Sequence, residues 1–445
     1  MKLWQKDTNS QPAVHAFTAG KDRQLDSYLA AHDVIGSLAH IQMLQRIGLL
    51  TTEEWHSLRD ALRKIHADVA AGSFTLSEDM EDIHSQVEWL LTEKLGDMGK
   101  KIHAARSRND QVLLDIRLFL RAELESLVNE IDTLFNLLQE KSETHKNDLL
   151  PGYTHLQLAM PSSFGLWFGA YAESLSDDLI TLEAAYRVVN KNPLGSAAGY
   201  GSSFPIDRTY TTELLGFDSM NYNVVYAQMG RGRSERIVAQ AMANVADTVG
   251  RLCMDVCLYL NPQFGFISFP DELTTGSSIM PHKKNPDVFE LTRARCNRIK
   301  SLPNEIQLIT TNLPSGYHRD LQLLKENLFP ALGELRDCLQ MTTFMLQQVS
   351  VKKDILEDKK FDHLFSVEAV NRLVQTGIPF RDAYKQVGRA IEAGEFTPER
   401  ALNHTHEGSM GRLCNSEIAA QYQSTRDRFP FQQIGEQIVR LLTGE

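Results

Sequence analysis

The segment VLLDIRLFLRAELESLVNEIDTLFNLL, residues 112–138, decides the fold of this 445-residue chain. Neither glycine nor proline interrupts it, and none follows until Pro151 and Gly152. Its apolar residues recur at spacings of three and four: Leu113, Ile116, Leu120, Leu124, Leu127, Ile131, Leu134 and Leu138. This spacing is typical of the apolar stripe of an amphipathic helix. The segment predicts a helix that continues to about Leu150 and whose stripe is roughly 40 Å long at about 1.5 Å per residue.

Four further segments show the same pattern: 161–189, 234–260, 286–311 and 324–349. Because loops rich in glycine and proline separate them and short alternating β segments are nearly absent, they predict an all-α, elongated helical bundle. Five such helices leave much apolar surface uncovered. Packing of helices between copies of the chain would cover it, and a monomer with a thicker C-terminal cover is the alternative.

Three helical domains are predicted. Residues 1–105 form an N-terminal domain with shorter helices at about 52–71 and 79–94, and residues 106–350 form the central bundle. A run of charged residues after Ser350 opens a smaller C-terminal domain, residues 351–445. This number of domains is ordinary for a chain of this length.

Composition limits the possible functions. The chain is 42% hydrophobic and 23% charged, as in ordinary globular proteins. Acidic residues outnumber Lys and Arg by 57 to 46, so the broad basic face of a nucleic-acid-binding protein is not expected. The first residues, MKLWQKDTNS, lack the apolar stretch of a signal peptide, and no apolar run is long enough to span a bilayer. We therefore predict a cytoplasmic protein that does not bind membranes.

The five cysteines are sparse and odd in number, so a disulfide framework is not expected. Cys253 and Cys257 lie four residues apart on a predicted helix. We interpret them as small core residues, with a pair of metal ligands as the alternative.

Five loop-like segments place polar groups beside glycine or proline at the ends of predicted helices. They are LDSYLAAHDVIGSLAH (25–40), HAARSRNDQ (103–111), GYTHLQLAMP (152–161), GSSIMPHKKNP (276–286) and LPSGYHRDLQLLK (313–325). A loop at a helix end offers backbone N–H groups and the positive end of the helix dipole, which suit an anionic ligand. Taken singly, each also has a structural interpretation: a helix cap at RSRND, a turn around His155, and a solvated face at Lys283-Lys284.

In combination, these segments resemble those of a known enzyme family. GSSIMPHKKNP resembles the GSSxMPxKxNP signature of the fumarase and aspartase superfamily of lyases. HAARSRNDQ, GYTHLQ, PLGSAAGYG and LPSGYHRDLQLLK resemble the segments of the argininosuccinate lyases within it. The resemblance extends from about Ser27 to about Gly388.

The resemblance implies a homotetramer whose central domains form a twenty-helix core, with each active site assembled from three subunits. It implies reversible cleavage of argininosuccinate into arginine and fumarate, the last step of arginine biosynthesis, without a cofactor or a metal. Such an elimination removes a C–H proton next to a carboxylate, and the resulting aci-carboxylate needs preorganised donors. The leaving nitrogen must also gain a proton.

The resemblance assigns four catalytic residues. Ser277 is the base, although a serine must be activated by loop N–H groups and nearby positive charge, which Lys283 supplies. His155 is the acid, and Glu290 orients it and raises its pKa. The residues alone leave Ser277 and Ser278 equally open as the base, and Glu290 is also consistent with an ordinary acid on a helix surface.

The resemblance also assigns substrate contacts: Ser27, Arg108, Asn109, Thr154, Asn285, Tyr317, Gln322 and Lys325. Asn109 and Thr154 would hold carboxylates beside the scissile bond, with positive charge from Arg108 and Lys325. Tyr317 and Gln322 would line the part of the site that holds the arginine moiety. For Ser27, an exposed serine on a helix is the alternative.

Two departures from the family pattern are visible. His282 stands where many members have glutamine, and QMGRGRSER at 228–236 differs from the more usual SDRD-like stretch. The histidine could alter the behaviour of its loop. The 228–236 segment puts subunit packing or part of the arginine pocket in doubt. Two alternative functions stay open: a lyase for another amine-linked succinate such as adenylosuccinate, and a non-catalytic, crystallin-like relative.

Overall fold

Helix α7 confirms the long helix predicted from the sequence. The computed structural model describes residues 12–77 and 80–444, and α7 spans Arg108–Thr144. A capping box starts the helix: the N–H of Asn109 donates to Ser107 Oγ (3.3 Å), and the N–H of Ser107 donates to the Asp110 carboxylate (2.9 Å). These bonds satisfy N–H groups that the start of a helix leaves without partners.

The prediction of where this helix ends was wrong. Instead of continuing to Leu150, the chain forms strand β1 (Leu149–Thr154), which pairs antiparallel with β2 (Gln157–Ser163). Helix α8 (Phe164–Val189) then begins after the predicted Pro161, because Ser163 Oγ accepts the N–H of Leu166 (3.1 Å) and caps it. A short apolar run fits a strand as well as a helical turn, so apolar spacing could not separate them.

The other long helices of the bundle follow in the predicted places. α11 spans Arg233–Leu260 and α14 spans Leu324–Gln347. The segment between them, predicted as one helix, forms two: α12 (Asp287–Ile299) and α13 (Leu302–Ile309). Pro303 lies in the first turn of α13, where a missing N–H is tolerated, whereas a continuous helix would have lost a hydrogen bond there.

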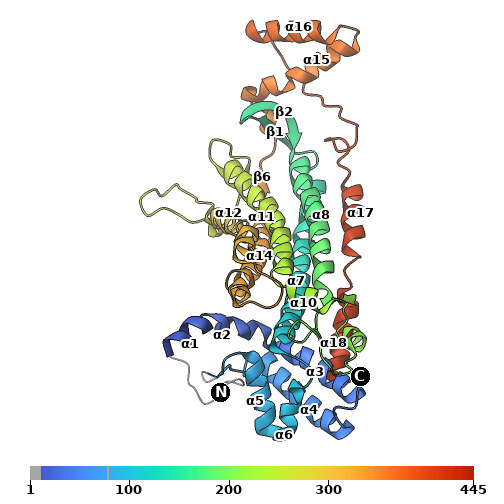
Figure 1. Ribbon diagram of the computed structural model, residues 1–445. Helices are drawn as coiled ribbons and strands as arrows, with labels where there is room; N and C mark the ends of the chain where they lie inside the picture. The colour runs from blue at the N-terminus through green and yellow to red at the C-terminus, as the bar shows by residue number, and fades with distance from the viewer. Residues whose placement is uncertain (1–11, 78–79, 445) are drawn as a thin grey trace.

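The predicted apolar stripe of α7 forms the centre of the core. Leu120, Leu124, Leu127, Ile131 and Leu138 are all 0% exposed. Helices α8 and α14 pack against α7, and α11 packs against α8 and α12 (Figure 1). Burial of each leucine stabilises the fold by about 1.5–3 kcal/mol, so the stripe holds the bundle together.

Shorter helices lie at one end of the bundle. The two predicted there are confirmed as α4 (Thr52–Ala70) and α5 (Ile83–Leu95). The predicted start of the second, Asp79, lies outside the described residues. The observed start follows Asp82, whose carboxylate accepts the N–H of Ser85 (2.8 Å), and the short α6 (Asp97–Lys100) comes next.

The same end holds the first helices of the chain: α1 (Pro12–Ala19), α2 (Asp22–Asp26) and α3 (Ala30–Arg46) (Figure 1). α3 packs against α4 and α7, and α2 packs against α14. The start of α7 and the start of α14 are thereby brought next to the N-terminal helices.

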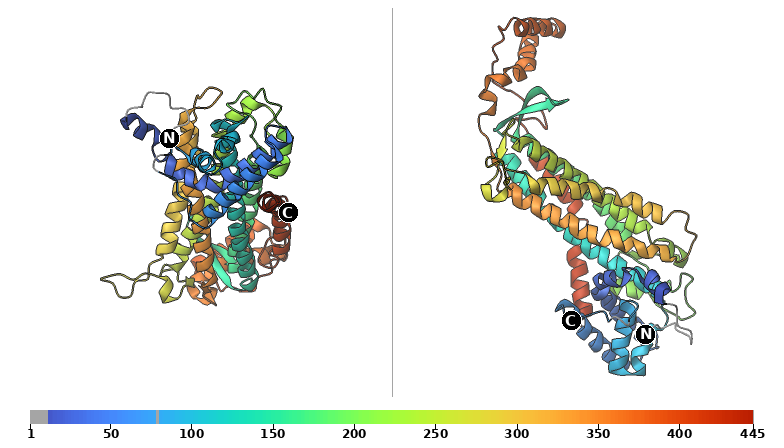
Figure 2. Two further views of the ribbon diagram at one scale, coloured as in Figure 1. Left: turned by 90° about the horizontal axis from the view of Figure 1, so that it is seen from below. Right: turned by 90° about the vertical axis from the view of Figure 1, so that its left-hand side faces the viewer.

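The C-terminal part of the chain reaches both ends of the bundle. α15 (Ser366–Gln375) and α16 (Phe380–Glu392) lie beyond the β1–β2 hairpin (Figure 1). The chain then turns back: α17 (Asn415–Arg426) packs along α8, and α18 (Phe431–Thr443) packs against α3 and α9 (Arg208–Leu214). Figure 2 shows this return from two other sides. The division into three domains stays a prediction.

The chain is mostly helical, as predicted, although short strands occur. β3 (Lys191–Asn192) pairs with β4 (Ser219–Met220), and β5 (Ile267–Ser268) pairs with β6 (Ser350–Val351). The remaining α-helix of the described residues is the short α10 (Val224–Met229), and short 3-10 helices connect some of the other elements.

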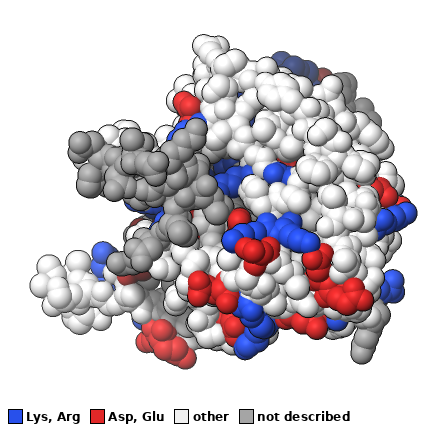
Figure 3. All heavy atoms as spheres, turned by 60° about the horizontal axis from the view of Figure 1, so that its bottom comes forward, with Lys and Arg blue, Asp and Glu red and all other residues white. Residues whose placement is uncertain are grey.

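The surface bears on several predictions. Among residues 12–77 and 80–444, every helix is too short or too polar to cross a bilayer. Positive and negative side chains alternate on the face in Figure 3 instead of forming one broad basic field. Cys253 is buried and Cys257 half-buried, and both are unpaired thiols. Large apolar side chains are exposed on the bundle helices: Ile180, Leu291, Leu308, Met341 and Phe344.

Candidate functional site

A cavity of about 460 Å³ lies where the first turn of α7 meets α1, α2 and the segment before α14. Five of the predicted substrate-binding residues line it: Arg108, Asn109, Tyr317, Gln322 and Lys325. Other charged side chains line it as well: Asp22, Asp26, Glu81, Asp82, His84, Arg231 and Arg319. Acidic and basic side chains therefore line one cavity together, which suits a ligand with both carboxylates and cationic nitrogens.

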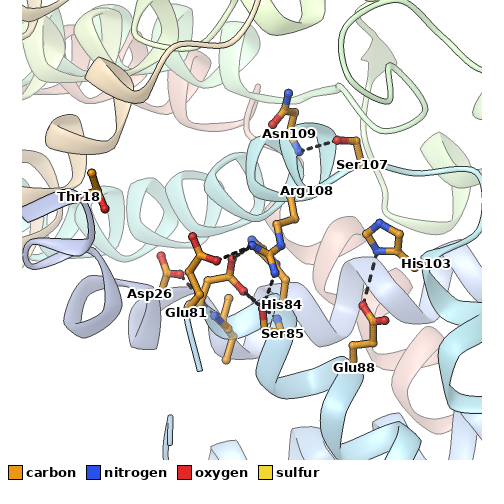
Figure 4. A network of polar contacts seen from close by, with 12 residues as sticks. Thr18, Asp26, Glu81, His84, Ser85, Glu88, His103, Ser107, Arg108 and Asn109 are labelled. Atoms are coloured by element: carbon orange, nitrogen blue, oxygen red, sulfur yellow. Dashed lines mark hydrogen bonds and ion pairs between the residues drawn. The ribbon is translucent and has the colours of Figure 1, made fainter. Parts of the chain in front are cut away.

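The capping box of α7 directs Arg108 toward this cavity from the first position of the helix. Its guanidinium lies 3.0 Å from Asp82 and 3.3 Å from Glu81, and it donates a hydrogen bond to Ser85 Oγ (2.6 Å) (Figure 4). A planar guanidinium can form paired hydrogen bonds to a carboxylate, so the same group can receive a carboxylate ligand.

Lys325 lies at the base of the cavity, and its side chain is only 3% exposed. Its ammonium donates to Asp26 (2.6 Å) and also pairs with Asp22. Burial alone would lower the pKa of Lys325, but the charges of Asp26 and Asp22 outweigh burial and raise it. Burial raises the pKa of Asp22 despite the opposing charge of the lysine. Lys325 is therefore a permanent cation held between two carboxylates.

Gln322 ties the cavity to the N-terminal helices. Its amide donates to the carbonyl oxygens of Thr18 and Ala19, each at 3.1 Å. Arg319 donates to the same Thr18 carbonyl (3.3 Å) and pairs with Glu81. The segment around α1 and α2 thus covers one side of the cavity.

The 228–236 segment, which departs from the family pattern, also reaches the cavity. Arg231 is buried, lines the cavity, donates to the carbonyl of Leu321 (3.1 Å) and pairs with Glu235 (3.3 Å). Gln228 donates to the carbonyl of Ala197 (3.2 Å). This segment therefore places an arginine beside the predicted arginine-binding part of the site.

Asp110 holds the PLGSAAGYG loop against the start of α7. The residue is 0% exposed, and its Oδ2 accepts the N–H groups of Gly195 (3.0 Å) and Ala197 (2.8 Å). Both loop residues have positive φ, 85° and 51°, a conformation that costs an alanine energy and therefore needs support from its surroundings. Burial raises the pKa of Asp110, although these N–H groups and Arg106 oppose the rise.

We expect Asp110→Ala to loosen this loop and lower stability. The substitution leaves the N–H groups of Gly195 and Ala197 buried without an acceptor, at about 1–3 kcal/mol for each group. Hydrogen exchange should report faster exchange of residues 193–201, and denaturant unfolding should report the loss of stability. Unchanged exchange in the loop would contradict the role given to Asp110.

The other three predicted substrate contacts, Ser27, Thr154 and Asn285, lie outside this cavity, as does the predicted acid His155. Ser27 Oγ donates to the carbonyl of Gln24 (2.6 Å), and the side chain does not line the cavity. Thr154 and His155 lie at the turn of the β1–β2 hairpin, toward the opposite end of the bundle (Figure 1). His155 and Leu156 have φ of 55° and 57°, the pattern of a tight type I′ hairpin turn, and both side chains are exposed.

The signature loop projects from the bundle before α12 (Figure 1). Thr275 and Asn285 close it through two backbone hydrogen bonds, N–H of Asn285 to O of Thr275 (2.8 Å) and the reverse (3.4 Å). Ser277 is half-buried, and its Oγ accepts the N–H of Met280 (3.2 Å). Lys283 is exposed, and the amide of Asn285 donates to the carbonyl of Gly276 (3.3 Å).

Glu290 is exposed in the first turn of α12, a different element from the β1–β2 hairpin that carries His155. Within one chain, the structure therefore leaves the predicted base, the predicted acid and the cavity in three separate regions (Figures 1 and 2).

Sequence reasoning missed the acidic side of the cavity and His84. Asp22 and Asp26 gain their role only through Lys325, about three hundred residues later in the chain, so no local spacing could reveal it. Glu81, Asp82 and His84 belong to the stretch MEDIHS, whose two acids directly precede a helix start and could have served as a signal.

Comparison with known proteins places the chain among lyases. A family model described as "Lyase" matches residues 7–300. Argininosuccinate lyase of Bacteroides fragilis is 59% identical over 443 residues, which are 100% of this chain and 99% of the relative. Argininosuccinate lyase of Parabacteroides distasonis is 60% identical over the same shares of both chains.

Among solved structures, an EDDS lyase variant with bound fumarate matches with a TM-score of 0.78 at 20% identity. The match covers 98% of this chain and 97% of that chain. At this identity the likeness shows a shared fold.

Proposed function

The chain belongs to the argininosuccinate lyase family, and on this premise we propose that it reversibly cleaves argininosuccinate into arginine and fumarate. One observation carries the proposal: the similarity to relatives named argininosuccinate lyase extends over the whole chain and not over a single domain. The reaction is the last step of arginine biosynthesis. The expected cytoplasmic location and the absence of a cofactor stay predictions.

The charges of the cavity support this substrate. Argininosuccinate has three carboxylates, a guanidinium and an amino group. Arg108 and Lys325 would exchange their acidic partners within the chain for substrate carboxylates, with Asn109 as a further donor. The released acids, such as Asp26 and Glu81, could then face the cationic nitrogens of the substrate.

The arginine moiety would lie against Tyr317 and Gln322, which line the same cavity. Thr154 and Asn285 would add contacts from the hairpin and the signature loop, and Ser27 from the turn after α2. These assignments rest on the family motif, and their tests are substitutions at each position.

For the chemistry, Ser277 would remove the proton next to the substrate carboxylate. The N–H groups of Ile279 (3.4 Å) and Met280 (3.2 Å) already donate to its Oγ, which favours the charged oxygen. Lys283, six residues along the same loop, would add the positive charge that stabilises the intermediate. Closure of the exposed loop over the substrate would exclude water.

On the other side of the substrate, His155 would protonate the leaving nitrogen, and Glu290 would orient its ring. An exposed histidine on a rigid hairpin turn can enter a neighbouring cavity without disturbing its own fold.

The separation of these parts supports a homotetramer with shared sites. The cavity, the hairpin and the loop would come from three different subunits, because one chain holds them apart. The exposed apolar side chains on the bundle helices, such as Ile180 and Phe344, would be buried between subunits. Equilibrium sedimentation tests the tetramer directly.

The proposed activity predicts release of fumarate when the purified protein meets argininosuccinate, followed by the ultraviolet absorbance of fumarate. Adenylosuccinate should be turned over roughly 10⁴-fold less efficiently, because the groups built for the arginine moiety would be left unpaired. Faster turnover of adenylosuccinate would assign the chain to the other amine-linked succinate. If a folded tetramer released no fumarate from either substrate, the protein would be a non-catalytic relative.

A further inference from the structure

Beneath the cavity, three buried side chains from different helices meet. His84, in the first turn of α5, has its Nδ1 2.9 Å from Asp33 Oδ1 and 3.5 Å from Asp115 Oδ2. Asp33 comes from α3 and Asp115 from α7, and their side chains are 0% and 1% exposed. We call Asp33 and Asp115 the carboxylate clamp. His84 itself lines the cavity, beside Arg108 and Ser85 in Figure 4.

The clamp has few hydrogen bonds of its own. The amide of Gln111 donates to Asp33 Oδ1 (2.6 Å). Asp33 Oδ2 and both oxygens of Asp115 are buried, and no hydrogen bond reaches them in the described structure. Buried carboxylates that lack hydrogen bonds need a nearby positive charge. His84 is the group that directly contacts both of them.

A proton explains the geometry better than a metal ion. The three ligand atoms lie within 4.8 Å of one another and could hold a divalent cation. However, 2.9 Å between Nδ1 and Asp33 is an ordinary hydrogen-bond distance, and the same oxygen already accepts the Gln111 amide. The half-buried Arg106, which interacts electrostatically with both carboxylates, already supplies one positive charge.

The charges around His84 favour its protonated form. Burial alone would lower the pKa of His84, but the hydrogen bond to Asp33 and the charges of Asp33, Asp115 and Asp82 raise it to about 9. Asp26 faces the same turn, since it accepts the N–H of Ile83 (3.4 Å). The nearby cations are Arg106 and Arg108, and burial together with these charges lowers the pKa of the neighbouring His103. Burial and the charge of Asp33 raise the pKa of Asp115, so its carboxylate is protonated first as the pH falls.

We propose that the carboxylate clamp holds His84 as an imidazolium whose Nε2–H donates a charge-assisted hydrogen bond to a substrate carboxylate. Because Nδ1 faces the clamp, Nε2 is the ring nitrogen left for the cavity. The inference rests on the proposed lyase function. His84 is then a catalytic residue, and Asp33 and Asp115 are positioning residues that act through it.

A protonated His84 would stabilise the negative charge that develops on the substrate during the elimination. Arg108 and Lys325 must break ion pairs with acidic residues before they can bind a substrate carboxylate. His84 can bind one through Nε2–H while its Nδ1–H stays bonded to the carboxylate clamp. When the carbanion forms, the substrate carboxylate gains a second negative charge. A preorganised cation binds that state more strongly than the ground state, which lowers the barrier.

His84→Asn tests the catalytic part of the inference. We expect kcat/KM for argininosuccinate to fall by about 10²–10³-fold, the usual cost of one preorganised donor. His103→Asn is the matched control, because His103 pairs with Glu88 (3.6 Å) and does not line the cavity. Equal activity of His84→Asn and wild type would overturn the inference while the measured fumarate release upheld the lyase function. An inactive wild type would reject the function and the inference together.

The pH profile tests the clamp. A group with a raised pKa is charged below that pKa, so kcat/KM of the wild type should fall as the pH rises through about 9. Asp115→Asn keeps the shape of the side chain and removes one negative neighbour. The alkaline limb should therefore move to lower pH while the circular dichroism spectrum stays unchanged.

NMR of ring-labelled histidine gives a readout besides activity. A titration near pH 9 that is lost in His84→Asn supports the imidazolium. A neutral His84 at pH 7, an alkaline limb unchanged in Asp115→Asn, or one divalent metal ion per chain in the purified protein would overturn the clamp.

Discussion

Ser277→Ala is expected to lower kcat for fumarate release by about 10²–10⁴-fold, the contribution of a positioned proton-transfer group. The side chain projects from a loop closed by the backbone of Thr275 and Asn285, and its Oγ only accepts N–H groups of that loop. Removing the hydroxyl therefore leaves the helical core and the cavity intact. Binding of argininosuccinate, measured by calorimetry, should stay close to that of the wild type.

Ser278→Ala is the matched control for this substitution. Ser278 is the neighbouring residue in the same loop and is exposed. Its loss should leave kcat within a small factor of the wild type. If Ser278→Ala lost activity and Ser277→Ala kept it, the base would be the other serine and the family assignment would fail at this position.

Lys325→Met is expected to lower the free energy of unfolding by about 3–5 kcal/mol, because it removes the ammonium paired with the buried Asp26 and the half-buried Asp22. The variant should also lose substrate binding. Denaturant unfolding measures the first effect and calorimetry the second. Lys300→Met removes an exposed pair with Asp247 and should change stability by less than about 1 kcal/mol.

A double variant separates the two effects of Lys325. Lys325→Met with Asp26→Asn removes one of the uncompensated charges, so stability should partly recover while substrate binding does not. Recovery of binding in the double variant would mean that Lys325 acts only as a structural cation.

The contribution of the Lys325–Asp26 ion pair to stability depends on pH in a definite direction. Because the pKa of Lys325 is raised in the folded state, its contribution to stability is complete below the ordinary lysine pKa. It is lost only as the pH rises through the raised value. The pair therefore stabilises the protein throughout the neutral range.

Apolar spacing predicted the long helices well, because their stripes continue over many turns. Apolar spacing did not predict where these helices end, because single hydrogen bonds determine the last residue of a helix. Leu149 and Leu150 continue the apolar pattern of α7 yet pair with Ser163 and Ser162 in the hairpin. Only the partner strand, which follows later in the sequence, explains this.

The sequence likewise predicted only part of the candidate site. Arg108 and Asn109 were found because a recognisable motif holds them at a helix start. The carboxylate clamp and His84 were missed because Asp33, His84 and Asp115 come from three helices, and each looks like an ordinary polar residue within its own segment. Side-chain pairing across the fold leaves no trace in local spacing.

The return of the last helix also determines when the protein can finish folding. α18 covers part of α3, although the two helices lie far apart in the chain and α18 is made much later. The part of α3 that α18 covers therefore stays exposed until α18 has been translated. Contacts between such distant parts of a chain form slowly. A nascent chain that lacks α18 therefore exposes part of α3 to non-specific contacts until α18 has been made.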